Sequence, residues 1–226
     1  MSENTLLSPL SLDEFLAKAL LPFAEVFAMP CSWISPFTDK INSRLVLVNW
    51  GTVIDPKILS AITIAARQMG DDGFFCSFVE ENLFHRGRVW MEEAENGGFY
   101  YPGLAPSDRR NLRTWFVGAD QLNESSNRDF MLSSFVLYSQ SARWGAYIHN
   151  EDFIIIGGDT EFIAAFATAL PDHESLTNEL IGHLKHLYPA WHPRLGDGSI
   201  IDVLVHAYGK TGTSHLLEPH GLDFST

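Results

Sequence analysis

Three short runs of β-forming residues, separated by turn-forming tripeptides, constrain the fold of this chain more than any other feature. The runs are 134–139, 144–149 and 153–157, and the tripeptides between them are 140–142 and 150–152. Short strands joined by connections this tight pair with their neighbours in the chain. The sequence therefore predicts an antiparallel meander in the second half of the protein.

A strand, a helix and a second strand are predicted upstream of the meander. Residues 44–50 and 74–80 are β-rich, and between them Asp55 and Pro56 begin an amphipathic helix, with Asp55 as its N-cap. Gly70 can adopt the left-handed conformation that ends such a helix. This spacing is typical of a β-α-β unit, although an antiparallel return of the second strand stays open.

Further helices are predicted at both ends of the chain. Ser11 and Glu14 have the spacing of a capping box at the start of an N-terminal helix, which Pro22 is expected to end. Three C-terminal helices are expected, at 162–170, at 176–188 with Ser175 as cap, and at 199–208. Each of them ends close to a proline or a glycine, the residues that most often interrupt a helix.

Together these elements predict one α+β domain over residues 1–226. Its core is a central, mostly antiparallel sheet with an N-terminal β-α-β segment, flanked by N- and C-terminal helices. No internal repeat and no Gly/Ser-rich linker divides the chain. Gly209 is expected to end the last helix. Residues 209–226 are therefore predicted to be a frayed terminus, and so are residues 1–10 at the other end of the chain.

The charge balance bears on the kind of partner. The chain has 28 acidic and 15 basic residues, which gives a formal net charge of −13. A surface this acidic repels phosphate backbones, because nucleic-acid binding depends on Lys and Arg that displace counterions. We therefore expect no nucleic-acid partner, whereas a basic protein would be attracted. Solubility alone explains the charge equally well.

The compartment is predicted from cysteine usage and hydropathy. Two cysteines, Cys31 and Cys76, favour a reducing environment, and Cys76 lies in an apolar run that predicts burial. The first residues lack the basic and apolar segments of a signal peptide, and no apolar stretch approaches the ~20 residues of a membrane span. We expect a cytoplasmic protein with no membrane contact.

Most histidines lie in the C-terminal third, where three residues form a weak candidate metal site. Glu179, His183 and His186 fall on one face of a predicted helix, away from its leucines. No further ligand stands at a recognised metal spacing, so a solvated polar face explains them better, and neither a metal nor another cofactor is expected. His206 lies in an apolar run and is predicted to be a satisfied core residue.

The segment 157–162, Gly-Gly-Asp-Thr-Glu-Phe, joins the meander to the next helix. A Gly-rich turn before a helix can hold an anion on free amide groups. A tight turn with Asp159 or Thr160 as the helix cap explains the same residues and is favoured. No pattern of a catalytic nucleophile is complete anywhere in the chain, so we expect no catalytic residues and, more generally, no enzyme.

Acidic and aromatic residues occur together in the irregular middle of the chain. Such a combination is typical of protein-binding surfaces, in which aromatic side chains supply affinity and charges steer association. The residues predicted to bind a partner are Trp90, Glu92, Glu93, Tyr100, Tyr101 and Trp115. The alternative, that the aromatic residues pack beneath their own loops, stays open.

These patterns favour a protein-binding domain that docks on a protein partner. In composition alone the chain is similar to small acidic immunity proteins, which block toxic bacterial enzymes, so a basic toxin enzyme is one partner that fits. A metal-dependent hydrolase that uses the C-terminal histidines and a structural subunit of a larger assembly are the alternatives. The oligomeric state is not predicted by any pattern in the chain.

Overall fold

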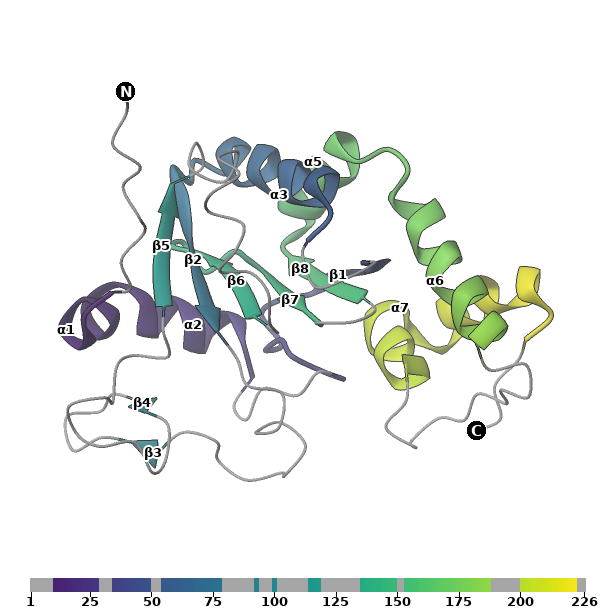
Figure 1. Ribbon diagram of the computed structural model, residues 1–226, viewed down its shortest axis with the longest axis horizontal. Coiled ribbons are helices and arrows are strands. Elements are labelled where there is room, and N and C mark those ends of the chain that lie inside the picture. Colours follow the sequence, from purple (N-terminus) through teal and green to yellow (C-terminus); the bar gives the residue numbers. More distant parts are fainter. Residues whose placement is uncertain are drawn as a thin grey trace.

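The computed structural model describes residues 10–28, 34–49, 54–78, 92–93, 99–100, 114–118, 135–149, 153–187 and 200–222. These residues form an α+β fold in which helices cover both faces of a six-stranded antiparallel sheet (Figure 1). The strands of this sheet are β1 (Ser43–Val48), β2 (Gly73–Phe78), β5 (Thr114–Gly118), β6 (Phe135–Ser139), β7 (Trp144–Ile148) and β8 (Phe153–Gly158). A separate two-stranded sheet pairs β3 (Glu92–Glu93) with β4 (Phe99–Tyr100).

The strand order β1-β8-β7-β6-β2-β5 confirms the predicted meander, because β6, β7 and β8 are consecutive antiparallel neighbours. The strand order also decides whether β1 and β2 are parallel or antiparallel, which the sequence left open. Four successive antiparallel pairings separate these two strands, so they point in the same direction without being neighbours. The β-α-β unit is therefore present, with the whole meander inserted between its two strands.

The crossover helix of that unit is α3 (Pro56–Gln68), and its start follows the prediction. The carboxylate of Asp55 accepts a hydrogen bond from the amide of Lys57 at 2.7 Å, which satisfies a donor that the helix itself leaves unpaired. Pro56 occupies the first turn, where a missing N–H has no cost. Gly70 follows the helix with a φ of 84°, in the left-handed region, as expected.

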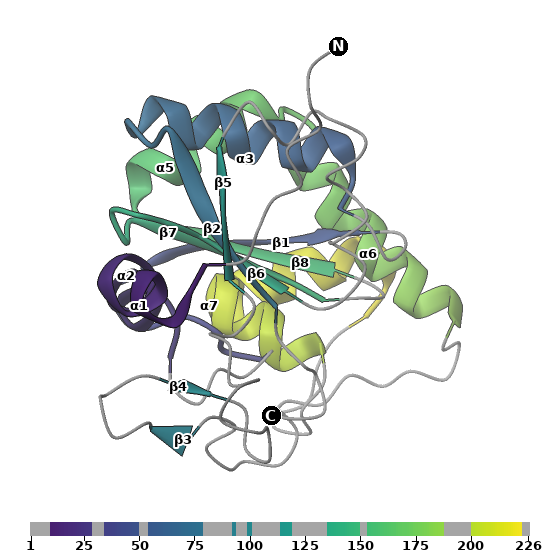
Figure 2. The ribbon, with the colours of Figure 1, turned by 60° about the vertical axis from the view of Figure 1, so that its left-hand side comes forward.

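Two hydrophobic cores lie on opposite faces of the sheet. In β8, Phe153 and Ile155 belong to one core, whereas Ile154 and Ile156 belong to the other. Alternate residues of a strand point to opposite faces, so an uninterrupted apolar strand can be buried on both sides. Helix α3 and helix α5 (Thr160–Ala169) cover one face, and the N-terminal helices and α7 (Ile200–Leu217) cover the other (Figure 2).

The N-terminal helical run is longer than expected. The capping box is confirmed, because the Ser11 amide donates to the Glu14 carboxylate at 2.8 Å and these bonds lower the pKa of Glu14. The run then continues through α1 (Leu12–Glu14), a π-helical segment (Phe15–Ala19) and α2 (Leu20–Val26). The prediction that Pro22 ends this helix is wrong. Pro22 lies in the first turn of α2, where its missing N–H leaves no hydrogen bond of that helix broken.

The C-terminal helices also differ from the prediction. Helix α6 (His173–Leu187) begins two residues before Ser175, so Ser175 is not its cap. Helix α7 does not end at Gly209, which adopts a φ of 70° and introduces a kink, and a 3-10 turn (Glu218–His220) follows it. Residues 210–220, which belong to the predicted frayed terminus, are therefore helical in the structure, and residues 1–9 and 223–226 lie outside the described residues. Leu217 is fully buried, and this packing holds the second half of α7 against the fold.

Within the described segments, no helix combines the length and the apolar character that crossing a membrane requires.

Candidate functional site

Three of the residues predicted to bind a partner lie in the two-stranded sheet of β3 and β4, called the β3–β4 ribbon below. Its register places Glu92 opposite Tyr100 and Glu93 opposite Phe99. Each pair therefore joins an acidic with an aromatic residue. Residues directly opposite in an antiparallel pair are close neighbours. An acidic residue is therefore paired in register with an aromatic residue at both positions of the ribbon.

The other predicted partner-binding residues are not part of this ribbon. Trp115 lies in β5, at the edge of the large sheet, where its register partner is Cys76 of β2. It is half-buried and packs against the core beneath α3 and α5, which favours the packing alternative for this residue. Trp90 and Tyr101 lie outside the described residues. Of the six, the structure brings together Glu92, Glu93 and Tyr100.

A long acidic segment follows the meander. Between Arg143 and Lys185 the sequence has seven acidic residues and neither Lys nor Arg. Four of these residues are exposed in the structure, on α5, on α6 or in the turn between them: Glu161, Asp172, Glu174 and Glu179. The negative charge is therefore presented to solvent along this part of the chain.

The turn at the start of α5 is closed by an ion-pair network rather than open to an anion. Asp159 is the N-cap, and its carboxylate accepts a hydrogen bond from the amide of Phe162 at 2.8 Å. The guanidinium of Arg143 binds Asp159 at 2.6 Å and Glu161 at 2.5 Å, and these hydrogen bonds raise the pKa of Arg143. The predicted tight turn with an Asp159 cap is confirmed.

Asp71 is a buried carboxylate with partners for both of its oxygens. It accepts hydrogen bonds from Trp144 Nε1 at 2.8 Å and from Ser141 Oγ at 3.4 Å. Desolvation raises the pKa of Asp71, and the bonds from Trp144 and Ser141 partly oppose this. Trp144 also stacks on Phe162, with ring centroids 4.9 Å apart. These contacts fix the β6–β7 hairpin against α3 and α5, which is a structural role.

The weak metal candidates lie on one helix, α6. Glu179 and His186 are exposed and His183 is half-buried. Over the described segments, no three His, Cys, Asp or Glu side chains gather closely enough to hold a metal ion. Cys76 is buried, and desolvation raises the pKa of its thiol, so it behaves as the small apolar residue that was predicted.

His206 has a more specific environment than the prediction of a core residue implies. Its ring is half-buried, and Nε2 lies 2.7 Å from the hydroxyl oxygen of Ser35. Arg44 of β1 donates from its guanidinium to the backbone oxygen of His206 at 3.0 Å. Desolvation lowers the pKa of His206, the charge of Arg44 lowers it further, and Asp39 opposes both. The sequence around His206 does not predict this contact, because Ser35 is 171 residues away.

Side chains of α6 and α7 cover the outer edge of β1. The hydroxyl of Thr177 donates to the carbonyl oxygen of Val46 at 2.7 Å, and the amide of Val46 donates to the hydroxyl of Tyr208 at 2.8 Å. A strand at the edge of a sheet otherwise offers such groups to another chain. At Val46 this edge is therefore closed by the protein itself.

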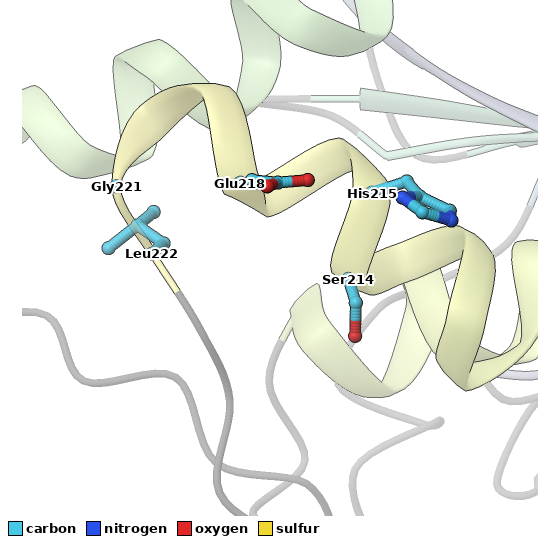
Figure 3. A pocket seen from close by; sticks show the side chains of 5 residues that line it. All are labelled: Ser214, His215, Glu218, Gly221 and Leu222. Carbon is cyan, nitrogen blue, oxygen red and sulfur yellow. The ribbon is translucent and has the colours of Figure 1, made fainter.

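A shallow depression lies at the C-terminal end of the described chain, lined by Ser214, His215, Glu218, Gly221 and Leu222 (Figure 3). Ser214 and His215 are adjacent in the sequence, but their side chains project in different directions from α7. Both residues are exposed. The depression is open to solvent, so it lacks the enclosure that usually accompanies a small-molecule site.

No protein-family model, no curated protein and no solved structure matches this chain.

Proposed function

We propose that this protein is an acidic binding domain that docks on a protein partner through the β3–β4 ribbon. The observation that carries the proposal is the register of the ribbon, which pairs Glu92 with Tyr100 and Glu93 with Phe99. Aromatic residues are enriched in the energetically important centre of protein interfaces, and charged residues beside them steer association. The register of the ribbon pairs one residue of each kind at both of its positions.

The charge of the whole chain supports a basic partner. With a net charge of −13, the protein attracts cationic surfaces over distances of about 8 Å at physiological ionic strength. The exposed acidic residues of α5 and α6 add to this field close to the fold. A basic enzyme, inhibited by an immunity-type partner in the cytoplasm, is the partner class that we propose.

The test is a binding measurement with the purified product of the gene adjacent to the one that encodes this chain. Titration calorimetry would be run with the wild-type protein and with the double variant E92K/E93K. We expect submicromolar binding by the wild type and at least tenfold weaker binding by the variant. The matched control is D172K/E174K, which changes the net charge by the same amount at the start of α6 and in the turn before it.

The control separates a docking site from general attraction between charges. Equal weakening by the two double variants would show that net charge alone drives association, and the ribbon would lose its assigned role. An unrelated basic protein, such as lysozyme, serves as a second control at the same salt concentration. Absence of binding to the adjacent gene product at 100-fold higher concentration, about 100 μM, would contradict the proposal.

A further inference from the structure

Ser35 and His206 form a side-chain contact that joins two distant parts of the chain. Ser35 lies in the segment between α2 and β1, and His206 lies in the first half of α7. The distance between Ser35 Oγ and His206 Nε2 is 2.7 Å. Both side chains are half-buried, so they are shielded in part from water but not enclosed by the core. A hydroxyl group hydrogen-bonded to an imidazole nitrogen is the basic unit of nucleophilic catalysis by serine.

The protonation state of His206 suits the role of a base. Desolvation and the neighbouring Arg44 both lower the pKa of His206, with Asp39 acting in the opposite direction. The imidazole is therefore neutral at neutral pH, and its Nε2 can accept the proton of the Ser35 hydroxyl. A protonated imidazole could only donate, and the hydroxyl would then gain no nucleophilic character.

Arg44 places a positive charge next to this pair. One guanidinium nitrogen donates to the backbone oxygen of His206, and the Nε–H of Arg44 is buried with no hydrogen-bond partner among the described residues. A fixed cation favours the negative charge that develops on a carbonyl oxygen during nucleophilic attack. The charge of Arg44 acts on His206, and its unpartnered Nε–H is a candidate donor to such an oxygen.

We propose that Ser35 is a nucleophile activated by His206 and that the site hydrolyses uncharged esters of small carboxylic acids. Ser35 Oγ bonds to the ester carbonyl carbon while His206 Nε2 takes the hydroxyl proton. The bond to the leaving alcohol then breaks, and His206 returns the proton to it. Water, deprotonated by His206, then bonds to the acyl carbon; the bond from that carbon to Ser35 Oγ breaks, His206 returns the proton to Ser35 Oγ, and the acid is released. The net charge of −13 disfavours anionic substrates, which is why an uncharged ester fits.

The first measurement uses two probes on the full-length protein. A fluorophosphonate would be followed by intact mass and peptide mapping, and p-nitrophenyl acetate by release of nitrophenol. We expect an adduct on Ser35, no adduct at that peptide in S35A, and hydrolysis at least 100-fold slower in H206Q than in the wild type. The acid limb of the rate profile should have its midpoint below pH 6.5, because the pKa of His206 lies below that value.

The matched controls are S214A and H215Q. These residues are another serine and another histidine, both on α7, and their side chains project in different directions (Figure 3). We expect both controls to keep the wild-type rate. The proposal is overturned if Ser35 forms no adduct and the wild type hydrolyses the ester no faster than S35A.

A second variant, S35C, keeps the proposal testable if S35A does not fold. In S35C the nucleophile is a thiol, and peptide mapping separates it from Cys31 and Cys76. With His206 as its base, this thiol should react with iodoacetamide at pH 6.5 at least tenfold faster than in S35C/H206Q. Equal rates in the two proteins would show that His206 does not activate position 35.

Discussion

The hydroxyl group of Tyr208 on α7 accepts a hydrogen bond from the backbone amide of Val46 on β1 at 2.8 Å. The hydroxyl of Thr177 on α6 donates to the carbonyl oxygen of the same residue. Two C-terminal helices therefore satisfy the outward-facing backbone groups of an edge strand with side chains. At Val46 these contacts keep the edge strand from pairing with another chain.

Removal of one of these hydroxyl groups should destabilise the fold. In T177V the shape is retained, but the carbonyl of Val46 loses its closer donor and keeps only the Tyr208 hydroxyl at 3.5 Å, so we expect a loss of about 0.5–1.5 kcal/mol in the free energy of unfolding. Urea denaturation followed by circular dichroism measures it. T177S keeps the hydroxyl and should lose less than half as much. A T177V protein as stable as the wild type would show that the edge contact contributes nothing.

Gly145 in β7 is expected to be intolerant of any side chain. A Cβ atom there would lie 2.5 Å from Cγ1 of Val26 on α2 and 3.0 Å from Cζ of Phe27. We expect G145A to lose about 1–3 kcal/mol of stability through overpacking, measured by the same denaturation assay. Because V26A removes the Cγ1 atom that the new Cβ would contact, G145A should cost less stability in the V26A background than in the wild type. Additive losses in the double variant would contradict this explanation.

The sequence predicted those elements whose signals are local. The meander, the Asp55 cap and the Asp159 cap depend on neighbouring residues, and all three are confirmed. The continuation of α7 past Gly209 depends instead on the burial of Leu217 against distant elements, which local propensity does not report. The insertion of the meander between β1 and β2 is a matter of strand order, which the local sequence does not report either.

The candidate sites were predictable to an even smaller extent. The sequence placed Glu92, Glu93 and Tyr100 in one irregular segment, and the register of the β3–β4 ribbon then made them neighbours. Nothing local joins Ser35 to His206, because 171 residues separate them and the contact depends on how α7 packs. The prediction that His206 is satisfied was confirmed through Ser35, whereas its place in the core was wrong, because the ring is half-buried.

The two acidic partners of Arg143 should contribute unequally to stability. Asp159 both binds Arg143 and caps α5, so D159A should lose about 1 kcal/mol or more in the free energy of unfolding. Glu161 makes an exposed ion pair alone, and E161A should lose less than D159A. Urea denaturation at low and at 0.5 M salt measures both. A larger loss in E161A than in D159A would contradict the assigned cap.

Mild acid should weaken the fold through His206 and His220. Desolvation lowers the pKa of both histidines from 6.5, assisted by Arg44 for His206 and Lys185 for His220, and for His206 opposed by Asp39. As the pH falls through 6.5, the unfolded chain takes up protons that the folded protein does not, so stability falls until the folded pKa is reached. Below that pH this contribution stays constant.

Denaturation curves between pH 7.5 and 5.5 measure this effect while most carboxylates remain ionised. We expect the wild type to lose stability over this range and H206Q to lose less, because glutamine does not titrate. An equal or larger loss in H206Q would show that His206 has an ordinary pKa in the folded protein.

Asp71 should show the opposite dependence on pH, because its charged form is the one present at higher pH. Because burial raises the pKa of Asp71, its ionised form costs stability above that pKa. D71N keeps an oxygen for Trp144 Nε1 and removes the charge, so we expect unchanged or higher stability at pH 7. D71A removes the acceptor and should be less stable than D71N. Thermal melting of both variants at pH 7 gives the comparison.

Docking through the ribbon is tested most directly by a hydrogen-exchange footprint of the protein in complex with the adjacent gene product. We expect complex formation to slow amide exchange in residues 92–100, which contain the β3–β4 ribbon. Exchange in the exposed acidic turn at Asp172 and Glu174 should change little. Protection confined to α5 and α6, with unchanged exchange in residues 92–100, would contradict the assignment of the ribbon as the docking surface.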